Sequence, residues 1–212
     1  MGSTTSSRRR YAPRVPPAQR REQLLDSALA LVLADGFHAV TMDGVARASG
    51  VTRPVVYGQF ADATALLAAL LDRSEERALA QLAHVVPALP GPDAAGPDPD
   101  DLLVDGVTAF LHAVRDDPGT WTVLLLPPQG APPQLRERVS AKQRLVLGQL
   151  RDLVAWGVRR RGDDELDVEL FARSVHALAE GAARLLLTSP DRFPVERIER
   201  FVRTLVRRLG PL

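Results

Sequence analysis

The chain has 212 residues and a formal net charge of +1, and it is long enough to bury a substantial core as one long or two short domains. It holds no cysteine, which excludes disulfides, thiolate zinc sites and thiol nucleophiles. Its apolar runs are too short to cross a bilayer, so we expect a cytoplasmic protein.

Positive charge is concentrated at the N-terminal end. Residues 1–60 hold eight arginines against four acidic residues, which predicts a polyanionic partner there. Residues 1–17 combine Ser, Thr, Arg and Pro with few apolar side chains, which predicts a disordered basic arm. Alternatively its arginines lie along phosphates or in a minor groove once DNA is bound, and the two interpretations are compatible. These arginines are Arg8, Arg9, Arg10 and Arg14.

A first helix is predicted over 18–35, because apolar residues recur there at helical spacing. Gly36 ends this helix, and Phe37 leads into the next segment. Arg20 and Arg21 fall in the first turn, where the helix dipole disfavours positive charge. A nearby phosphate would explain these two arginines, and a solvated helix end is the alternative.

The stretch 41–60 predicts two short helices joined by a tight turn. Thr41 is a good N-cap, and Gly50 suits the left-handed residue that ends the first of these helices. Thr52 is expected to cap the second helix. Pro54 fits the first turn of that helix, where an amide proton would have no partner.

Both short helices should bury one side against the first helix. The residues expected to face inward are Val45, Ala46, Val55, Val56 and Phe60. The second short helix keeps an outward face that combines a guanidinium, a phenol and an amide with little bulk. That face consists of Arg53, Pro54, Tyr57, Gly58 and Gln59. It suits a DNA major groove, and a core helical hairpin without a role in DNA binding is the alternative.

The order of these features resembles the TetR family of transcriptional regulators. The resemblance rests on a first helix followed by Gly36-Phe37, Thr41, Ala46, Gly50-Val51, Tyr57 and Phe60. It implies a three-helix helix-turn-helix domain that contacts DNA through Thr41, Thr52, Arg53, Pro54, Tyr57, Gly58 and Gln59. In similar proteins a lysine six residues after the tyrosine holds a phosphate. Here Ala63 occupies that position, so we expect either that affinity depends more on the arginine arm or that DNA binding is weaker than the motif suggests.

Helical patterns continue to the end of the chain, and no strand pattern interrupts them. The predicted helices span 62–86, 102–115, 119–126, 134–161, 165–187 and 194–209. A surface loop is expected over 87–101, where helix capping and solvation explain the acidic residues better than a calcium site does. The first of these helices should bury its leucines and expose Arg73, Glu75, Glu76 and Arg77.

The sequence therefore predicts an all-α protein in three parts. A basic arm covers 1–17, and the N-terminal helix-turn-helix DNA-binding domain covers 18–61. The resemblance implies that a C-terminal helical domain over 62–212 binds an effector and forms a dimer.

The helix predicted over 165–187 carries two adjacent apolar stripes, which indicates burial on two sides. One stripe is Phe171, Val175, Leu178, Ala182 and Leu185, and the other is Ala172, His176, Ala179, Ala183 and Leu186. The last helix offers Ile198, Phe201, Val202, Leu205, Val206 and Leu209. The resemblance implies that these two helices form half of an intermolecular four-helix bundle in a homodimer. The alternative is that one monomer satisfies both faces.

No constellation of residues suits catalysis or metal binding. The histidines lack i, i+4 partners, the serines lie outside nucleophile-elbow patterns, and no glycine-rich loop resembles a phosphate cradle. We therefore expect no enzyme activity, no cofactor and no metal. The resemblance implies a mostly apolar effector pocket, with ordinary core packing as the alternative for each wall residue. The expected wall consists of Phe110, His112, Trp121, Leu125, Gln143, Leu147, His176 and Glu180.

Taken together, these features predict a sequence-specific, DNA-binding transcriptional regulator. We expect a repressor that an apolar small molecule releases from a palindromic, double-stranded DNA operator. The effector should act near Trp121, because the short helix there lies between prolines and can shift more readily than a long one. An architectural DNA-binding protein without an effector is one alternative, which footprinting would distinguish. A ligand carrier or enzyme on the same helical scaffold is another.

Overall fold

The computed structural model describes residues 16–83, 97–125, 133–162 and 165–209. Within these ranges the regular elements are all helical, which confirms the all-α class. They are α1 (Pro17–Asp35), the 3₁₀ turn η1 (Phe37–Ala39), α2 (Met42–Ser49), α3 (Arg53–Tyr57), α4 (Ala63–Leu82), α5 (Pro99–Asp116), α6 (Pro118–Leu125), α7 (Pro133–Arg161), α8 (Val168–Thr188) and α9 (Val195–Leu209). The predicted arm up to residue 15 and most of the predicted loop over 87–101 lie outside the described residues.

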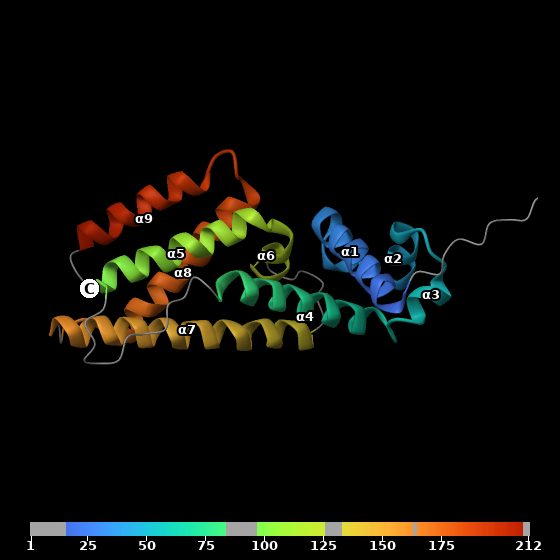
Figure 1. Cartoon of the computed structure of the whole chain (residues 1–212), viewed down its shortest axis with the longest axis horizontal. Coiled ribbons are helices and arrows are strands. Elements are labelled where there is room, and N and C mark those ends of the chain that lie inside the picture. The colour runs from blue at the N-terminus through green and yellow to red at the C-terminus, as the bar shows by residue number, and fades with distance from the viewer. Residues whose placement is uncertain (1–15, 84–96, 126–132, 163–164, 210–212) are drawn as a thin grey trace, which may run out of the picture.

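The helices divide into a head and a body. Figure 1 shows the head, α1 to α3, at one end of the molecule and the body, α5 to α9, at the other. Helix α4 begins beside the head and runs into the body, where the long α7 lies alongside it. Helix α4 therefore runs without a break from the head into the body.

One apolar core holds the head together and extends beyond it. Its fully buried members come from the three head helices and from α4, and they are Leu24, Ala28, Val45, Val56, Leu66 and Leu70. Val123 of α6 belongs to the same core. Packing is therefore continuous across residue 61, where the sequence places a domain boundary, and that division stays a prediction.

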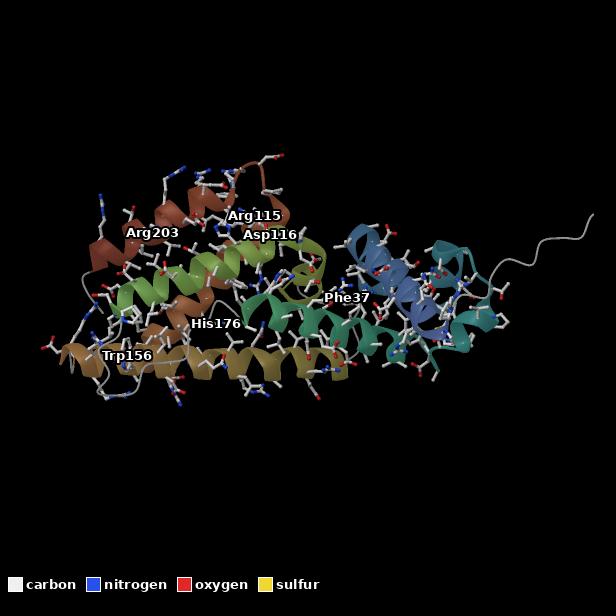
Figure 2. All side chains as sticks on the ribbon, in the orientation of Figure 1. Phe37, Arg115, Asp116, Trp156, His176 and Arg203 are labelled. Atoms are coloured by element: carbon white, nitrogen blue, oxygen red, sulfur yellow. The ribbon has the colours of Figure 1, made fainter. Side chains whose placement is uncertain are left out.

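The body has two further cores. The larger one joins α4, α5, α6, α8 and α9, and its most buried members are Leu111, Val114, Ala183 and Val195. The smaller one packs Val154 and Val158 of α7 against Ala172 of α8. Figure 2 shows Trp156 on α7 and His176 on α8 within this part of the molecule. Helix α6 contributes to both large cores, because Trp121 and Leu125 pack into the body core while Val123 packs into the head core.

Arg73 of α4 is buried, whereas the sequence predicts it on an outward face. It follows Leu66 and Leu70 at helical spacing, so it lies on the side of α4 that packs against α1. Its Nη1 donates to Glu22 Oε2 at 3.0 Å and to Asp26 Oδ1 at 2.7 Å. One guanidinium therefore ties α4 to two successive turns of α1. The prediction that Arg73 is exposed was wrong. It relied on the charge of the side chain and not on the helical spacing that places Arg73 beside Leu66 and Leu70.

Two helices begin three residues away from their predicted starts, and a capping aspartate explains each. Helix α8 begins at Val168 rather than 165, because Asp167 Oδ1 accepts from the Leu170 amide at 3.0 Å. Helix α5 begins at Pro99 rather than 102, because Asp98 Oδ1 accepts from the Asp100 amide at 2.8 Å. The prediction that α4 reaches residue 86 lies outside the described residues. None of the described helices is long and apolar enough to span a bilayer.

Candidate functional site

The first helix of the predicted DNA-reading pair is fixed at its start. Thr41 Oγ1 accepts from the Gly44 amide at 2.9 Å, so Thr41 is the N-cap that the sequence predicts. Gly44 lies so close to the preceding turn that an added Cβ would be 2.9 Å from the Ala39 carbonyl oxygen. Only glycine fits there without a shift of backbone. The first turn of α2, which carries Asp43, is therefore held in one position.

The turn between α2 and α3 follows the predicted course. Gly50 has φ 67°, the left-handed conformation that glycine adopts without strain. The amide of Val51 then donates to the Ala46 carbonyl at 3.1 Å. Thr52, however, makes no side-chain cap, so that prediction was wrong. A proline at position 54 has no amide proton to offer, and the Val55 amide already donates to the Thr52 carbonyl at 2.9 Å.

Helix α3 is anchored by one side only. Val56 is fully buried and Phe60, just beyond the helix, is nearly so. Val55 is 38% exposed, so the prediction that it faces inward was wrong. The helix has five residues, and a single buried stripe through Val56 and Phe60 leaves its neighbours at the surface. The side chains of Arg53, Pro54 and Tyr57 lie on this exposed part, as does Gly58, while Gln59 is half-buried.

Arg53 is held in place by two neighbours. Its Nε forms an ion pair with Asp43 Oδ1 at 3.2 Å, and its Nη2 donates to the Tyr57 hydroxyl oxygen at 3.1 Å. The guanidinium carbon also lies 5.4 Å from the centre of the Tyr57 ring. The hydrogen bond to Tyr57 and the charge of Asp43 raise the pKa of Arg53 above its usual value. Arg53 is therefore charged and oriented at the protein surface.

Sequence reasoning missed two contacts in this region. It identified Arg53 and Tyr57, but not Asp43, which lies ten residues before Arg53 on a different helix. It also left Arg21 to a phosphate or to solvent. In the structure, the Arg21 guanidinium lies 4.4 Å from the centre of the Phe60 ring and donates to the Gln59 carbonyl at 3.2 Å. Arg21 thus fixes the end of the α3 segment against α1.

The residues predicted to line an effector pocket separate into groups. Phe110 and Trp121 meet edge to face, with ring centres 5.1 Å apart, and Leu125 shares their core. Trp121 Nε1 donates to Gln81 Oε1 at 2.9 Å, which connects α6 to the end of α4. Gln81 Nε2 in turn donates to Asp117 Oδ2 at 3.2 Å. Gln81 was not predicted from the sequence, because no local pattern distinguishes it from other polar residues of α4.

A second group joins α7 to α8. Gln143 Nε2 donates to Glu180 Oε1 at 2.9 Å, and His176 Nε2 lies 4.0 Å from the same oxygen. Arg184 donates to Glu180 Oε2 at 3.1 Å and to the Leu125 carbonyl at 3.0 Å. Through Arg184 this polar group reaches the end of α6, which the aromatic group also occupies.

Two of the predicted wall residues lie elsewhere. His112 Nε2 is 2.5 Å from Glu199 Oε1, so His112 connects α5 to α9. Leu147 packs beside the small core between α7 and α8. Helical spacing placed both residues on the correct helices, but it did not determine which neighbouring helix each of them faces.

Asp98 and Asp100, at the start of α5, both pair with an arginine at the end of α7. Arg161 Nη1 donates to Asp100 Oδ1 at 3.0 Å, and Arg161 also pairs with Asp98. The Asp100 amide and Arg161 hold the pKa of Asp98 below its usual value. Across the described ranges, no group of three or more His, Cys, Asp or Glu side chains is placed to hold a metal ion.

Exposed apolar side chains gather on the two last helices. Leu178 of α8 is 54% exposed and Phe201 of α9 is 60% exposed, and Leu170 and Leu185 of α8 are also at the surface. Ala172, Ala183 and Leu186 of the other predicted stripe lie in the cores, although Ala179 is exposed. The first stripe is only partly covered: Phe171 and Ala182 pack against the cores, whereas Leu178 and Leu185 stay exposed.

Two models of known protein families match the sequence of this chain. Residues 24–70 match the model for bacterial regulatory proteins of the tetR family. Residues 99–211, more than half of the chain, match the model for the C-terminal part of BetI-type transcriptional repressors. The first match covers the head helices and the start of α4, and the second covers the body.

Individual proteins of similar sequence or structure agree with these matches. The chain is 24% identical over 188 residues to the HTH-type transcriptional activator FasR of Mycolicibacterium smegmatis, covering 89% of this chain and 80% of that protein. A TetR-like transcriptional regulator from Rhodococcus sp. RHA1 has a similar fold, with a TM-score of 0.71 at 22% identity, covering 92% of this chain and 97% of that one. The fatty acid degradation regulator FadR from Bacillus halodurans has a TM-score of 0.67 at 15% identity, covering 93% and 96%.

Proposed function

This chain belongs to the TetR family of bacterial regulatory proteins and is a DNA-binding transcriptional regulator rather than an enzyme, and we propose that it is a repressor that leaves a palindromic operator when an apolar small molecule binds. The observation that carries the proposal is the exposed face of α3. Arg53 and Tyr57 are presented at the surface while Val56 and Phe60 anchor the helix beneath them. Guanidinium and phenol groups on a short, anchored helix suit base edges and phosphates in a major groove.

Within this proposal Arg53 and Tyr57 have different partners. Arginine donates to two acceptors of guanine at once, so Arg53 reads a base. The Tyr57 oxygen accepts from Arg53, which leaves its own proton for a phosphate oxygen. Thr41, Thr52 and Gly58 bring the backbone close to the same strand. The positively charged N-terminal arm adds affinity that does not depend on sequence.

The homodimer part of the proposal rests on the apolar residues that α8 and α9 leave exposed. Leu178 and Phe201 are large apolar side chains that the protomer leaves exposed, and helix pairs of this kind are satisfied by a second copy in a four-helix bundle. A two-fold axis through that bundle places one α3 on each side. The operator is then an inverted repeat, whose half-sites lie about one helical turn, or roughly 34–36 Å, or a longer in-phase distance apart.

The effector part of the proposal rests on α6. This helix of eight residues packs Val123 into the head core and Trp121 into the body core, so a shift of α6 disturbs both. The aromatic pair of Phe110 and Trp121 offers an apolar surface, with Gln143 and Glu180 as polar anchors nearby on α7 and α8. FadR is by name a regulator of fatty acid degradation, so fatty acids are the first apolar class to test.

The sign of regulation is supported by the body's match to BetI-type repressors, whereas FasR is named an activator. A reporter gene behind the selected operator decides between them. Expression should fall when the protein is supplied and recover with effector. Expression that rises with the protein would overturn the repressor part of the proposal.

The DNA-reading face is tested by replacing Arg53 with alanine. We expect Arg53→Ala to weaken the selected site by about 5- to 150-fold and to relax preference at one base position, because a bidentate contact to guanine is lost. The matched control is Arg151→Ala, which removes the same charge from an exposed position on α7. Fluorescence anisotropy with labelled duplexes measures both variants. Equal affinities for wild type and Arg53→Ala on every duplex would sink this assignment.

The effector part of the proposal is tested by the thermodynamic linkage between ligand binding and operator binding. A ligand that weakens operator binding must itself be weakened by operator DNA by the same factor, typically about 5- to 150-fold. Quenching of Trp121 fluorescence detects the ligand, and a Trp156→Phe background leaves Trp121 as the sole reporter. A tightly bound ligand that leaves operator affinity unchanged would contradict the effector part. A ligand with equal affinity for both conformations of the protein cannot shift the equilibrium between them.

A further inference from the structure

We propose that Asp43 is a specificity-determining residue, which positions the Arg53 guanidinium so that its terminal edge faces a base. The inference rests on the proposed DNA-reading role of α3, and it adds a residue that does not itself touch a base. Asp43 lies in the first turn of α2, and Arg53 is the first residue of α3. The ion pair between Asp43 Oδ1 and Arg53 Nε, at 3.2 Å, therefore links the two helices of the reading pair.

The geometry determines which edge of the guanidinium remains available. Nε is the guanidinium nitrogen in the ion pair with Asp43, whereas the printed hydrogen bond of Arg53 is made by the terminal nitrogen Nη2. Nη2 donates one proton to Tyr57 and retains a second, and Nη1 has two. Among the described residues no further polar contact to this guanidinium is seen. Nη1 and the remaining proton of Nη2 can therefore donate to a base, and arginine reads guanine through two such hydrogen bonds to O6 and N7.

The backbone that carries Asp43 is well fixed, which a positioning residue needs. The Thr41 cap and the close packing of Gly44 hold its turn of α2, and a replacement of Gly44 would collide with backbone. Arginine is a long side chain that loses considerable rotamer freedom when it binds. By ordering Arg53 before DNA arrives, Asp43 reduces that loss for the correct geometry and disfavours other geometries.

The charge of Asp43 has a second consequence. A carboxylate beside the DNA-reading face repels phosphates, so it weakens binding to every duplex. It also offsets part of the charge of Arg53, which discourages Arg53 from pairing with a phosphate in place of a base. Asp43 therefore lowers general affinity and raises discrimination, as repulsive elements do in specific interfaces.

The test compares base discrimination in four proteins: wild type, Asp43→Asn, Arg53→Ala and the double variant. The probes are the selected duplex and its three substitutions at the base pair where Arg53→Ala relaxes preference. Asp43→Asn should reduce discrimination at that base pair by at least about fivefold, while affinity for an unrelated duplex stays equal or rises. In the Arg53→Ala background, Asp43→Asn should change discrimination no further, because the group it positions is gone.

A control variant separates positioning from general electrostatics. Asp35→Asn removes the same charge from an exposed position at the end of α1, so it should leave base discrimination unchanged. Retained discrimination in Asp43→Asn would overturn the inference, as would an equal loss in both backgrounds, which would report a disturbed α2. If Arg53→Ala itself leaves discrimination intact, the DNA-reading assignment of α3 fails instead, so the two failures are distinct.

Discussion

At the scale of single residues, the surface of α3 combines Arg53, the proposed base-reading residue, with Tyr57, the proposed phosphate-binding residue. Arg53 is oriented by Asp43 on one side and by Tyr57 on the other. The Tyr57 hydroxyl accepts from Arg53, so its proton points away from the guanidinium. Arg53 and Tyr57 belong to one network of contacts, but we expect their substitutions to change DNA binding in different ways.

Tyr57→Phe should lower affinity for all duplexes by a similar factor, about 3- to 10-fold, because it removes a hydrogen bond to phosphate but no contact to a base. Base preference should persist, since the ring stays beneath Arg53 and Asp43 still pairs with it. Binding of wild type and variant to a panel of single-base substitutions is the measurement. A change in preference at one position, with affinity elsewhere preserved, would show that Tyr57 reads a base.

At the scale of elements, the start of α2 fixes the position of α2, the first helix of the proposed DNA-reading pair α2 and α3. Thr41 caps it, and Gly44 allows the close approach to the Ala39 carbonyl. Because Asp43 lies between these residues, the local structure that forms the helix also places the residue that orients Arg53. We therefore expect stability and the proposed DNA recognition to depend on the same turn.

Gly44→Ala should destabilise the protein by about 1–3 kcal/mol, because the new Cβ would lie 2.9 Å from a backbone oxygen that cannot easily move. Gly106→Ala is the matched control. Gly106 also lies within a helix, but nothing is within 4 Å of an added Cβ, so this change should be neutral or stabilising by about 0.5–1 kcal/mol. Denaturant unfolding of the two variants measures the difference. Equal effects would contradict the close approach at Gly44.

The helices could largely be predicted from the sequence, because the residues that begin and end a helix act locally. Thr41, Gly50 and Pro54 act within a few residues of their own position, and apolar spacing identifies the buried sides. Contacts between distant segments were not predictable in the same way. Arg73 meets Glu22 and Asp26 only because α4 packs on α1, and no pattern within α4 indicates which residues of α1 lie opposite.

The same limit applies to the candidate sites. The exposed face of α3 follows from a short motif, so Arg53 and Tyr57 were identified, whereas Val55 was misplaced because so short a helix has only one buried stripe. The effector wall requires knowledge of which helices face each other. His112 lies against α9 and Leu147 against α8, and spacing along α5 and α7 does not contain that information.

At the scale of the whole molecule, α4 and α6 connect the head to the body. Arg73 joins α4 to α1, and Arg138 of α7 pairs with Asp72 and Glu75 on the same part of α4. Helix α6 packs into both large cores. A change in the body therefore has physical routes to the head, and in a dimer it would alter the separation of the two α3 helices.

Leu178→Glu should convert the protein to a monomer, because it places a charge in the proposed apolar interface of α8. Leu145→Glu is the matched control, since Leu145 is an exposed leucine on α7, outside the proposed interface, and is 64% exposed against 54% for Leu178. Light scattering at micromolar concentration distinguishes the two states. Wild type and Leu145→Glu should be dimers. A monomeric wild type, or a dimeric Leu178→Glu, would contradict the proposed four-helix bundle.

The most direct test of the central claim is selection of bound duplexes from a random pool by the full-length protein. A dimeric regulator that presents one α3 on each side of a two-fold axis should enrich a single inverted repeat, with half-site centres about one helical turn or an in-phase multiple apart. A pool that stays unenriched, or that yields a site without two-fold symmetry, would contradict the account of this chain as a sequence-specific, dimeric DNA-binding regulator.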